Sequence, residues 1–276
     1  MTLVEHLYEL RGRLFKAAVA VIIASVLSFI YFKPIFGFIL HPYCRLPQDK
    51  TALSGHGCTV YAFSVLDQFN ARLKVSMFVG GLLSAPVWLY QLWRFITPGL
   101  HTKERKWAVV FVSIGSVLFG LGTVLAYFAL YTGLQFLLTV GGGSVTTLLD
   151  ISGYLRYVTA MVLVFGLAFE FPLVLGMLNV VGVLSHQRLA GWRRQAIFLC
   201  FLFAAFATPG QDPFGMTALG ACLWLLYELT LVITRVHDKR KSRREARQRA
   251  AQGWENIGDD DVSPLDPKPS DLSDIS

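Results

Sequence analysis

Six apolar runs, separated by short polar connections, dominate the sequence. They cover residues 17–32, 75–93, 107–130, 157–181, 196–207 and 214–234. Backbone hydrogen bonds in a bilayer must be satisfied within the protein, so such runs cross as helices, and a core about 30 Å thick needs about 20 residues. Only 16% of the residues are charged, which is below soluble usage. The runs predict an all-α, polytopic integral membrane protein with six transmembrane helices.

The fifth and sixth runs are expected to form a shallow hairpin. The fifth, 196–207, has twelve residues and reaches about 18 Å at 1.5 Å per residue, less than the hydrocarbon core. A TPGQDP turn follows it, and Glu228 interrupts the sixth run near its end. We predict that helices five and six are both short and that the bilayer thins beside them.

Lysine and arginine gather on one side of the predicted spans. The N-terminus carries three, the 94–106 loop four, the 185–194 loop three and the tail many more. On the other side they are diluted over a long first loop, Arg156 stands alone, and the 208–213 turn has none. Because basic residues favour the cytoplasmic side, both termini are predicted to be cytoplasmic. The net charge of +7 reflects this placement, so we expect no nucleic-acid partner.

Three segments lie outside the predicted spans. HLYELRGRL, at 6–14, is expected to be a short amphipathic helix on the membrane surface, since its leucines share one stripe. Residues 33–70, rich in Pro and Gly, are expected to form an external cap loop. Residues 1–234 would then be the transmembrane domain. Residues 235–276 would be a largely disordered cytoplasmic tail, basic and then acidic, whose basic half could lie as a helix over anionic lipid.

Two cysteines, Cys44 and Cys58, fall in the predicted external loop, where the compartment is oxidising. A bridge between them would close a loop of about 15 residues and contribute roughly 3 kcal/mol in the chain-entropy model. Two unpaired thiols remain the alternative, because sequence does not give their geometry. Cys200 and Cys222 lie inside apolar runs and are expected to be core residues.

Motifs of catalysis or nucleotide binding are absent from the sequence. It contains no P-loop, GxGxxG, HExxH, CxxC or GxSxG pattern. The six histidines are scattered over different loops on both sides of the predicted membrane. We therefore expect no metal site, no cofactor and no enzymatic activity.

Two acids, Glu9 and Glu104, depart from the charge of the basic segments around them, ELRGR and TKERK. One interpretation is an ordinary neutralised surface, because Glu9 is i,i+4 to Arg13 and exposed pairs of this kind are common and weak. The other is a binding site for a cationic partner. Arginine would suit it, because a guanidinium matches a carboxylate with two parallel hydrogen bonds. A passive scaffold would leave these acids unexplained.

Glu170 stands alone in the middle of the fourth apolar run, two residues before Pro172. An acid at the bilayer midplane costs roughly 2.5–3.5 kcal/mol on insertion scales and tends to mark a functional surface. Pro172 removes a backbone donor and is expected to kink the helix. A proton-coupled secondary transporter with Glu170 titrating is one interpretation, although no internal repeat supports it. A polar group that faces protein or water within the membrane, without titrating, is the other.

Four stretches together resemble the TatC family, over about residues 3–235. They are HLYELRGRL, LSAPVWLYQLWRFITPGLHTKERK, AFEFP and the TP…D turn before the sixth run. The family is the signal-peptide receptor and core of the twin-arginine protein translocase. The resemblance implies export of folded proteins across the bacterial cytoplasmic membrane, driven by the proton-motive force. It also implies an oligomeric complex with single-span TatA- and TatB-type partners.

The resemblance implies roles for individual residues. The pocket for the paired arginines of the signal peptide would be formed by Glu9, Arg11, Phe95 and Glu104. Pro98 would set the turn that presents Glu104. Glu170 would face a concave surface and contact a polar side chain of a TatA- or TatB-type helix.

Two further residues, Pro42 and Asp212, match family positions linked to activity. A loop kink at Pro42 and an ordinary turn acid at Asp212 remain open as alternatives. TPGQDP carries one more residue before its acid than the family pattern. The cysteine pair and the long tail also depart from that pattern.

Overall fold

A computed structural model describes residues 3–45, 62–96, 105–140 and 150–251. Every regular element within these ranges is helical. In chain order they are α1 (Leu3–Ile30), α2 (Phe32–Cys44), α3 (Asp67–Leu83), α4 (Ala85–Ile96), α5 (Arg105–Val140), α6 (Ile151–Ala168), α7 (Phe171–Val180), α8 (His186–Gly191), α9 (Arg193–Ala207), the short 3₁₀ turn η2 (Pro209–Gln211) and α10 (Pro213–Ala251). The prediction of an all-α chain is confirmed for these residues.

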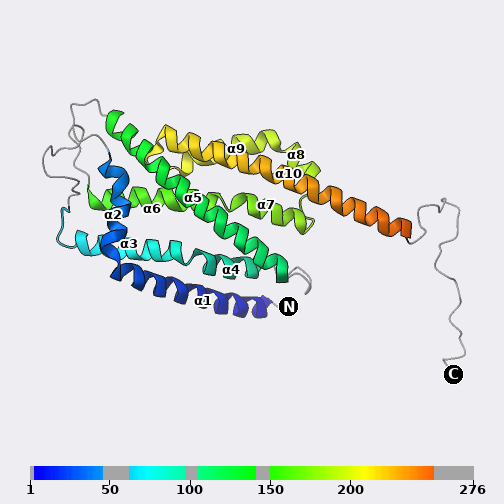
Figure 1. Cartoon of the computed structure of the whole chain (residues 1–276), viewed down its shortest axis with the longest axis horizontal. Coiled ribbons are helices and arrows are strands. Elements are labelled where there is room, and N and C mark those ends of the chain that lie inside the picture. The colour runs from blue at the N-terminus through cyan, green and yellow to red at the C-terminus, as the bar shows by residue number, and fades with distance from the viewer. Residues whose placement is uncertain (1–2, 46–61, 97–104, 141–149, 252–276) are drawn as a thin grey trace, which may run out of the picture.

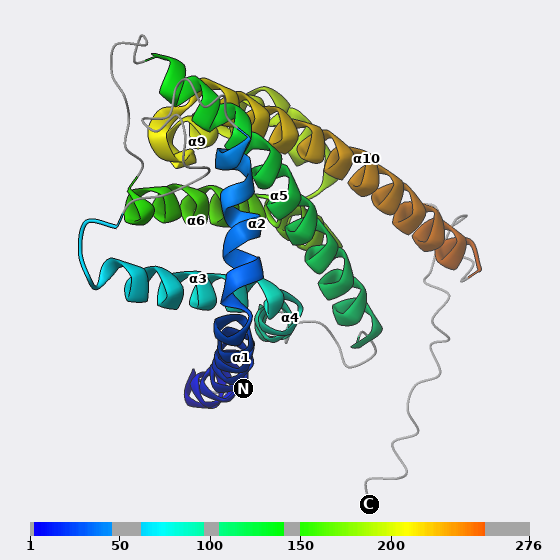
Figure 2. The same cartoon turned by 60° about the vertical axis from the view of Figure 1, so that its left-hand side comes forward.

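The long helices form a bundle with two distinct ends (Figure 1). α1 packs against α3 and α4, α5 against α6, and α9 against α10. The start of α1 lies at the same end as the last turns of α4 and α7 and the start of α5, and we call this the amino-terminal end. The opposite end, here called the α2 end, holds the starts of α3 and α6 and the α9–α10 turn. There α2 stands across the direction of α3 and α6 (Figure 2).

Burial differs sharply between the first helix and the central ones. In the most apolar stretch of α6 and α7, 61% of residues are buried, against 6% for α1. A buried cluster joins Leu130 of α5 to Tyr154 and Phe165 of α6, and a second joins Trp93 of α4 to Met177 of α7. The apolar surface of α1 suits contact with lipid, whereas α6 and α7 form the centre of the protein.

α1 is one continuous helix of 28 residues. The prediction of a separate surface helix at 6–14 before a span at 17–32 is therefore wrong. Phe15 and Lys16, which lie between the two predicted elements, carry no breaking signal, so the backbone hydrogen bonding continues through them.

The predicted external loop at 33–70 is wrong over its first third, where α2 runs from Phe32 to Cys44. Pro34 lies in the first turn of this helix, where the N–H that it lacks has no intrahelical partner in any case. Cys44 ends α2 and is disulfide-bonded, while Cys200 and Cys222 are free. Its predicted partner, Cys58, lies outside the described residues.

The second predicted span is a bent pair of helices. α3 and α4 meet at Ser84 with an angle of 58° between them. Pro86, the second residue of α4, cannot donate a backbone hydrogen bond across the junction. Side chains close the bend instead: Ser84 Oγ donates to the carbonyl of Gly80 at 2.8 Å, and Trp88 Nε1 donates to that of Gly81 at 3.0 Å.

The fourth predicted span is interrupted where the proline indicated. α6 ends at Ala168 and α7 begins at Phe171, one residue before Pro172. The two helices together still form one apolar stretch of 30 residues that is long enough to cross a membrane. Glu170 therefore lies at a helix junction in the middle of a span.

The described helices make this a multi-pass membrane protein. α1, α5, α10 and the α6–α7 stretch are each long and apolar enough to cross, and the bent α3–α4 pair would be a fifth span. α9 has 15 residues and reaches about 22 Å, so it is short, as predicted. The predicted total of six spans depends on whether α9 crosses.

The sixth helix is long, so that part of the prediction is wrong. α10 has 39 residues and continues from the apolar run into the basic segment, up to Ala251. Arg, Lys, Glu, Gln and Ala favour helix, so the basic half extends the helix instead of ending it. The boundary at residue 234 is a change in charge and not in fold. Residues 252–276, the acidic half of the predicted tail, lie outside the described residues.

Candidate functional site

Glu9 lies on α1 at the amino-terminal end, one turn before Arg13. Arg13 Nε donates to Glu9 Oε1 at 3.1 Å, and a terminal nitrogen of the same guanidinium pairs with that oxygen. The side chains of Glu9 and Arg13 are 28% and 13% exposed. The i,i+4 pair expected from the sequence is present, and it orients the Glu9 carboxylate.

The structure describes three of the four residues assigned to the signal-peptide pocket. Arg11 is exposed, and Phe95 is half-buried in the last turn of α4. Because α1 packs against α4, Glu9 and Phe95 lie at the same end of the bundle. Glu104 and Pro98 lie outside the described residues, and α5 begins at Arg105, the residue after Glu104.

Glu170 is the N-cap residue of α7 and is 8% exposed. Its carboxylate faces α5, where Gly115 provides the space for it. A Cβ at Gly115 would lie 3.0 Å from Oε2 and 3.4 Å from Oε1 of Glu170. The glycine therefore allows a carboxylate to fit between α5 and α7, where a larger residue would push it aside.

The hydrogen-bonding capacity of Glu170 is poorly used inside the chain. Its side chain does not cap α7, and neither carboxylate oxygen accepts a well-formed hydrogen bond from the described residues. The Trp93 side chain of α4 is close enough to interact with the carboxylate, although the geometry falls short of a regular hydrogen bond. A buried polar group in this condition costs free energy, which a suitable partner would recover.

Asp212 lies at the α2 end and is completely buried. It directly precedes Pro213, the first residue of α10, and its Oδ2 accepts the N–H of Gly215 at 2.6 Å. This is the geometry of a helix N-cap followed by proline. Burial raises the pKa of Asp212 above its ordinary value, opposed by the hydrogen bond from Gly215 and by the nearby Tyr157 hydroxyl.

Two helices converge on the Asp212 carboxylate. Tyr157 of α6 directs its hydroxyl toward it, and Gly133 of α5 leaves room for both groups. A Cβ at Gly133 would lie 2.8 Å from Asp212 Oδ2, and it would overlap the Tyr157 hydroxyl. Asp212 is thus buried where α5, α6 and α10 meet. The sequence pattern did not indicate this contact between the three helices.

Pro42 lies inside α2, so the alternative of a loop kink there is wrong. Because proline has no N–H, the carbonyl of Phe38, four residues earlier, loses its helical donor. The Tyr127 hydroxyl of α5 lies 3.4 Å from that carbonyl and donates to it. In the same helix, the hydroxyl of Tyr154 on α6 donates to the carbonyl of Ile39 at 2.5 Å. Two tyrosines that no sequence pattern indicated therefore anchor α2.

Asp238 is a second residue that the sequence did not indicate, because it falls in the segment expected to be tail. Its Oδ1 accepts a hydrogen bond from Asn179 Nδ2 at 3.1 Å, and its Oδ2 accepts the N–H of His186 at 2.9 Å. Asn179 Nδ2 also donates to the carbonyl of Leu184 at 2.8 Å. These contacts fasten the α7–α8 connection to the start of the basic half of α10.

Comparison with known proteins identifies close relatives over most of the chain. Residues 5–221 match the family TatC, described as Sec-independent protein translocase protein. A protein of that name from Frankia casuarinae is 49% identical over 270 residues, which cover 96% of this chain and 73% of the relative. The protein of that name from Aquifex aeolicus is 33% identical over 245 residues, which cover 87% of this chain and 98% of the relative.

The fold also matches solved structures. The crystal structure of the twin arginine translocase receptor TatC in DDM superposes with a TM-score of 0.69 at 31% identity. The match covers 83% of this chain and 99% of that one. A second crystal structure of the twin arginine translocase receptor TatC gives a TM-score of 0.67, again at 31% identity.

Proposed function

Because the chain belongs to the TatC family of Sec-independent protein translocase proteins, we propose that it is the receptor that binds twin-arginine signal peptides. As a family member it is a membrane-embedded component of a protein translocase. Its role is transport and not catalysis. Glu9, Arg11, Phe95 and Glu104 are proposed to form the peptide pocket, on the cytoplasmic side of a bacterial cytoplasmic membrane, with both termini on that side.

The observation that carries this proposal is that Glu9 and Phe95 lie at the same end of the bundle, on two helices that pack together. They come from segments 86 residues apart in sequence, and the packing of α1 against α4 brings them to the same end. A carboxylate and an aromatic ring at the same end suit a guanidinium, which can donate two hydrogen bonds to the carboxylate and stack on the ring. Lysine in the signal peptide should bind less well, because it offers a point charge without the planar fork.

The Glu9–Arg13 pair provides a sharp test of the pocket. A peptide arginine must compete with Arg13 for Glu9, so Arg13→Gln should strengthen site-specific crosslinking of a twin-arginine precursor. Glu9→Ala should weaken it. Glu245→Ala is the matched control, because Glu245 is an exposed acid on α10. If Glu9→Ala and Arg13→Gln both crosslink as wild type does, Glu9 is not part of the receptor site.

Glu170 is proposed to be a contact for the single transmembrane helix of a TatA- or TatB-type partner. Its poorly satisfied carboxylate within an apolar span supports this role, since one polar contact can fix the register of an otherwise apolar helix. The 8% exposure means that the partner must displace part of the present surroundings or that the side chain must turn outward. Transport is proposed to use the proton-motive force in an oligomeric complex, with the short α9 helping to thin the bilayer.

The same burial of Glu170 favours one competing function, proton-coupled solute transport. The two can be separated directly. Export of a folded reporter that depends on paired arginines in its signal supports the translocase receptor. Solute uptake by the purified protein in liposomes, lost in Glu170→Gln, would support the transporter.

A further inference from the structure

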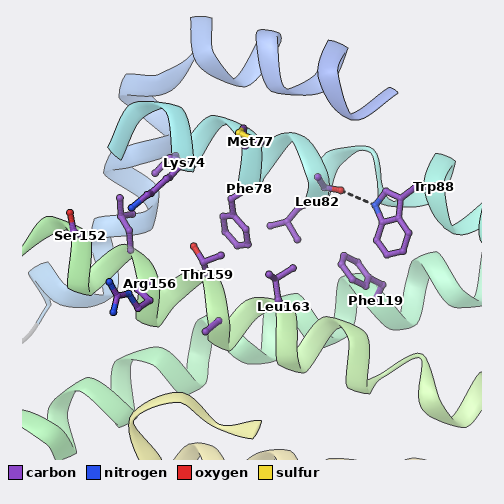
Figure 3. A pocket seen from close by; sticks show the side chains of 14 residues that line it. Lys74, Met77, Phe78, Leu82, Trp88, Phe119, Ser152, Arg156, Thr159 and Leu163 are labelled. Atoms are coloured by element: carbon purple, nitrogen blue, oxygen red, sulfur yellow. Dashed lines mark hydrogen bonds between the residues drawn. The ribbon is translucent and has the colours of Figure 1, made fainter. Parts of the chain in front are cut away.

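A cavity of about 730 Å³ opens between α3, α4 and α6, with Phe119 of α5 at one end, and neither Glu170 nor any residue of the proposed peptide pocket lines it. Its walls are mainly apolar, with Phe78 and Leu82 on one side and Leu163 on the other (Figure 3). At the inner end, Trp88 and Phe119 meet edge to face, with ring centres 5.6 Å apart. These residues make a slot that is apolar along its length and closed by aromatic rings.

The opposite end of the cavity is basic. Lys74 of α3 and Arg156 of α6 lie there together with Ser152, from opposite walls (Figure 3). Both basic side chains are exposed, and within the described part of the chain neither forms an ion pair or a hydrogen bond. Asp150, at the start of α6, caps its own helix by accepting the N–H of Gly153 at 2.9 Å. Two cationic groups therefore face one mouth of an apolar slot.

The length of the slot matches one leaflet of a bilayer. Ser152 and Leu163 mark its two ends along α6, and eleven rises of 1.5 Å place them about 16 Å apart. Half of a hydrocarbon core is about 15 Å. A chain that starts at the basic mouth would thus end near the bilayer midplane, where Trp88 and Phe119 close the slot.

The volume is too small to enclose a helix of a partner or a signal peptide completely. A helix 10–12 Å across rises 1.5 Å per residue, so each residue occupies roughly 120–170 Å³. A cavity of about 730 Å³ therefore holds only some five residues of helix. A single acyl chain, which is much thinner, can follow the slot over its full length.

We infer that the slot between α3, α4 and α6 is a binding site for a phospholipid with an anionic headgroup. Lys74 and Arg156 bind the phosphate, and Ser152 is placed to donate a further hydrogen bond. One acyl chain lies between Phe78, Leu82 and Leu163, and the other stays in the bilayer. This site does not depend on signal-peptide binding, because it shares no residue with that pocket. It places an anionic lipid at the α2 end, which is the outer leaflet in the proposed orientation.

Native mass spectrometry of the purified full-length protein tests the headgroup contact. Phosphatidylglycerol and phosphatidylcholine with the same acyl chains are the probes. Lys74→Gln with Arg156→Gln should weaken phosphatidylglycerol binding roughly 30-fold, about 2 kcal/mol at one per basic residue. Phosphatidylcholine should lose less, because its choline group offsets the charge of its phosphate. The control, Lys33→Gln with Arg45→Gln, removes two exposed charges near the same end and should leave both lipids bound.

A filling variant tests the acyl slot separately. Gly81 lines the cavity, and a Cβ there meets nothing within 4 Å, so Gly81→Leu can project into the slot without a clash at the backbone. It should reduce binding of both lipids, whereas Gly120→Leu, at a similarly open position outside the cavity, should not. Unchanged phosphatidylglycerol binding in the charge variant overturns the proposal. So does a Gly81→Leu protein that keeps its lipid but no longer crosslinks a signal peptide, because the slot would then hold peptide.

Discussion

Gly115 on α5 lies directly against the carboxylate of Glu170, with 3.0 Å between the position of a Cβ and Oε2. A methyl group at this position would require the carboxylate and the Leu173 side chain to give way by a few tenths of an ångström. The glycine and the acid are therefore one structural unit, although they are 55 residues apart in the sequence.

Gly115→Ala should destabilise the protein by about 1–3 kcal/mol, the usual cost of overpacking a filled interior. Gly120→Ala is the matched control, since a Cβ there meets nothing within 4 Å and alanine favours the helix. Thermal unfolding in detergent measures the difference. Equal stability of the two variants would mean that α5 and α7 adjust freely around Glu170.

Glu170→Gln should preserve most of the export of a twin-arginine reporter, whereas Glu170→Ala should lose it. Glutamine keeps a hydrogen-bonding group of the same size at the proposed partner contact, and alanine removes it. Disulfide crosslinking from cysteines near residue 170 to a partner helix gives the matching binding readout. Equal loss of export in both variants would point to a titrating carboxyl, since glutamine cannot exchange a proton.

Asp212→Ala should destabilise the protein by about 1 kcal/mol or somewhat more, because it removes the N-cap of α10. Asp212→Asn should cost less, since asparagine caps helices about as well as aspartate. Thermal unfolding of both variants tests this order. If the asparagine variant is as stable as wild type but fails in export, the role of Asp212 goes beyond holding the turn.

Pro42 and Tyr127 should be energetically coupled through the Phe38 carbonyl. Tyr127→Phe removes the hydroxyl that replaces the missing helical donor, at a cost of about 1 kcal/mol. In a Pro42→Ala protein the alanine N–H can bond to Phe38 itself, so the same change should cost less. A double-mutant cycle on thermal stability measures the coupling. Additive effects would mean that the Tyr127 hydroxyl does not replace the hydrogen-bond donor that Pro42 lacks.

Asp238→Ala should loosen the α7–α8 connection by about 1–2 kcal/mol, because the N–H of His186 and the amide of Asn179 each lose an acceptor. Faster hydrogen exchange across 179–186 is the expected result. Glu245→Ala, further along the exposed part of α10, should leave this exchange unchanged. Slow exchange in the Asp238 variant would show that apolar packing alone holds the connection.

The sequence was sufficient for features that depend on composition along the chain. Apolar runs located the long helices, and Pro172 located the break between α6 and α7. The sequence was not sufficient where a side chain far away in the chain changes the structure that a local pattern normally predicts. Pro42 was placed in an external loop, but it lies inside α2, where Tyr127 of α5 donates to the carbonyl that the proline leaves without a helical donor. No pattern within α2 contains that information.

The candidate site was predictable to a similar degree. Glu9 and Glu170 stood out because each departs from the character of its surroundings. Gly115, Tyr157 and Asp238 did not, since a glycine, a tyrosine and an acid in these positions are ordinary as sequence. Their importance comes from contacts with other helices. Gly115 makes room for Glu170, Tyr157 faces Asp212, and Asp238 accepts the N–H of His186.

α10 is unbroken from its cap at Asp212 to Ala251, so it acts as a rigid rod about 58 Å long. Its basic half extends beyond the other helices (Figure 1). Tilting the rod by about 10° about the Asp212 turn would sweep its far end through roughly 10 Å. Small movements at the Asp212 turn would thus become large displacements of a spectroscopic label near residue 248, at the other end of the helix and across the membrane.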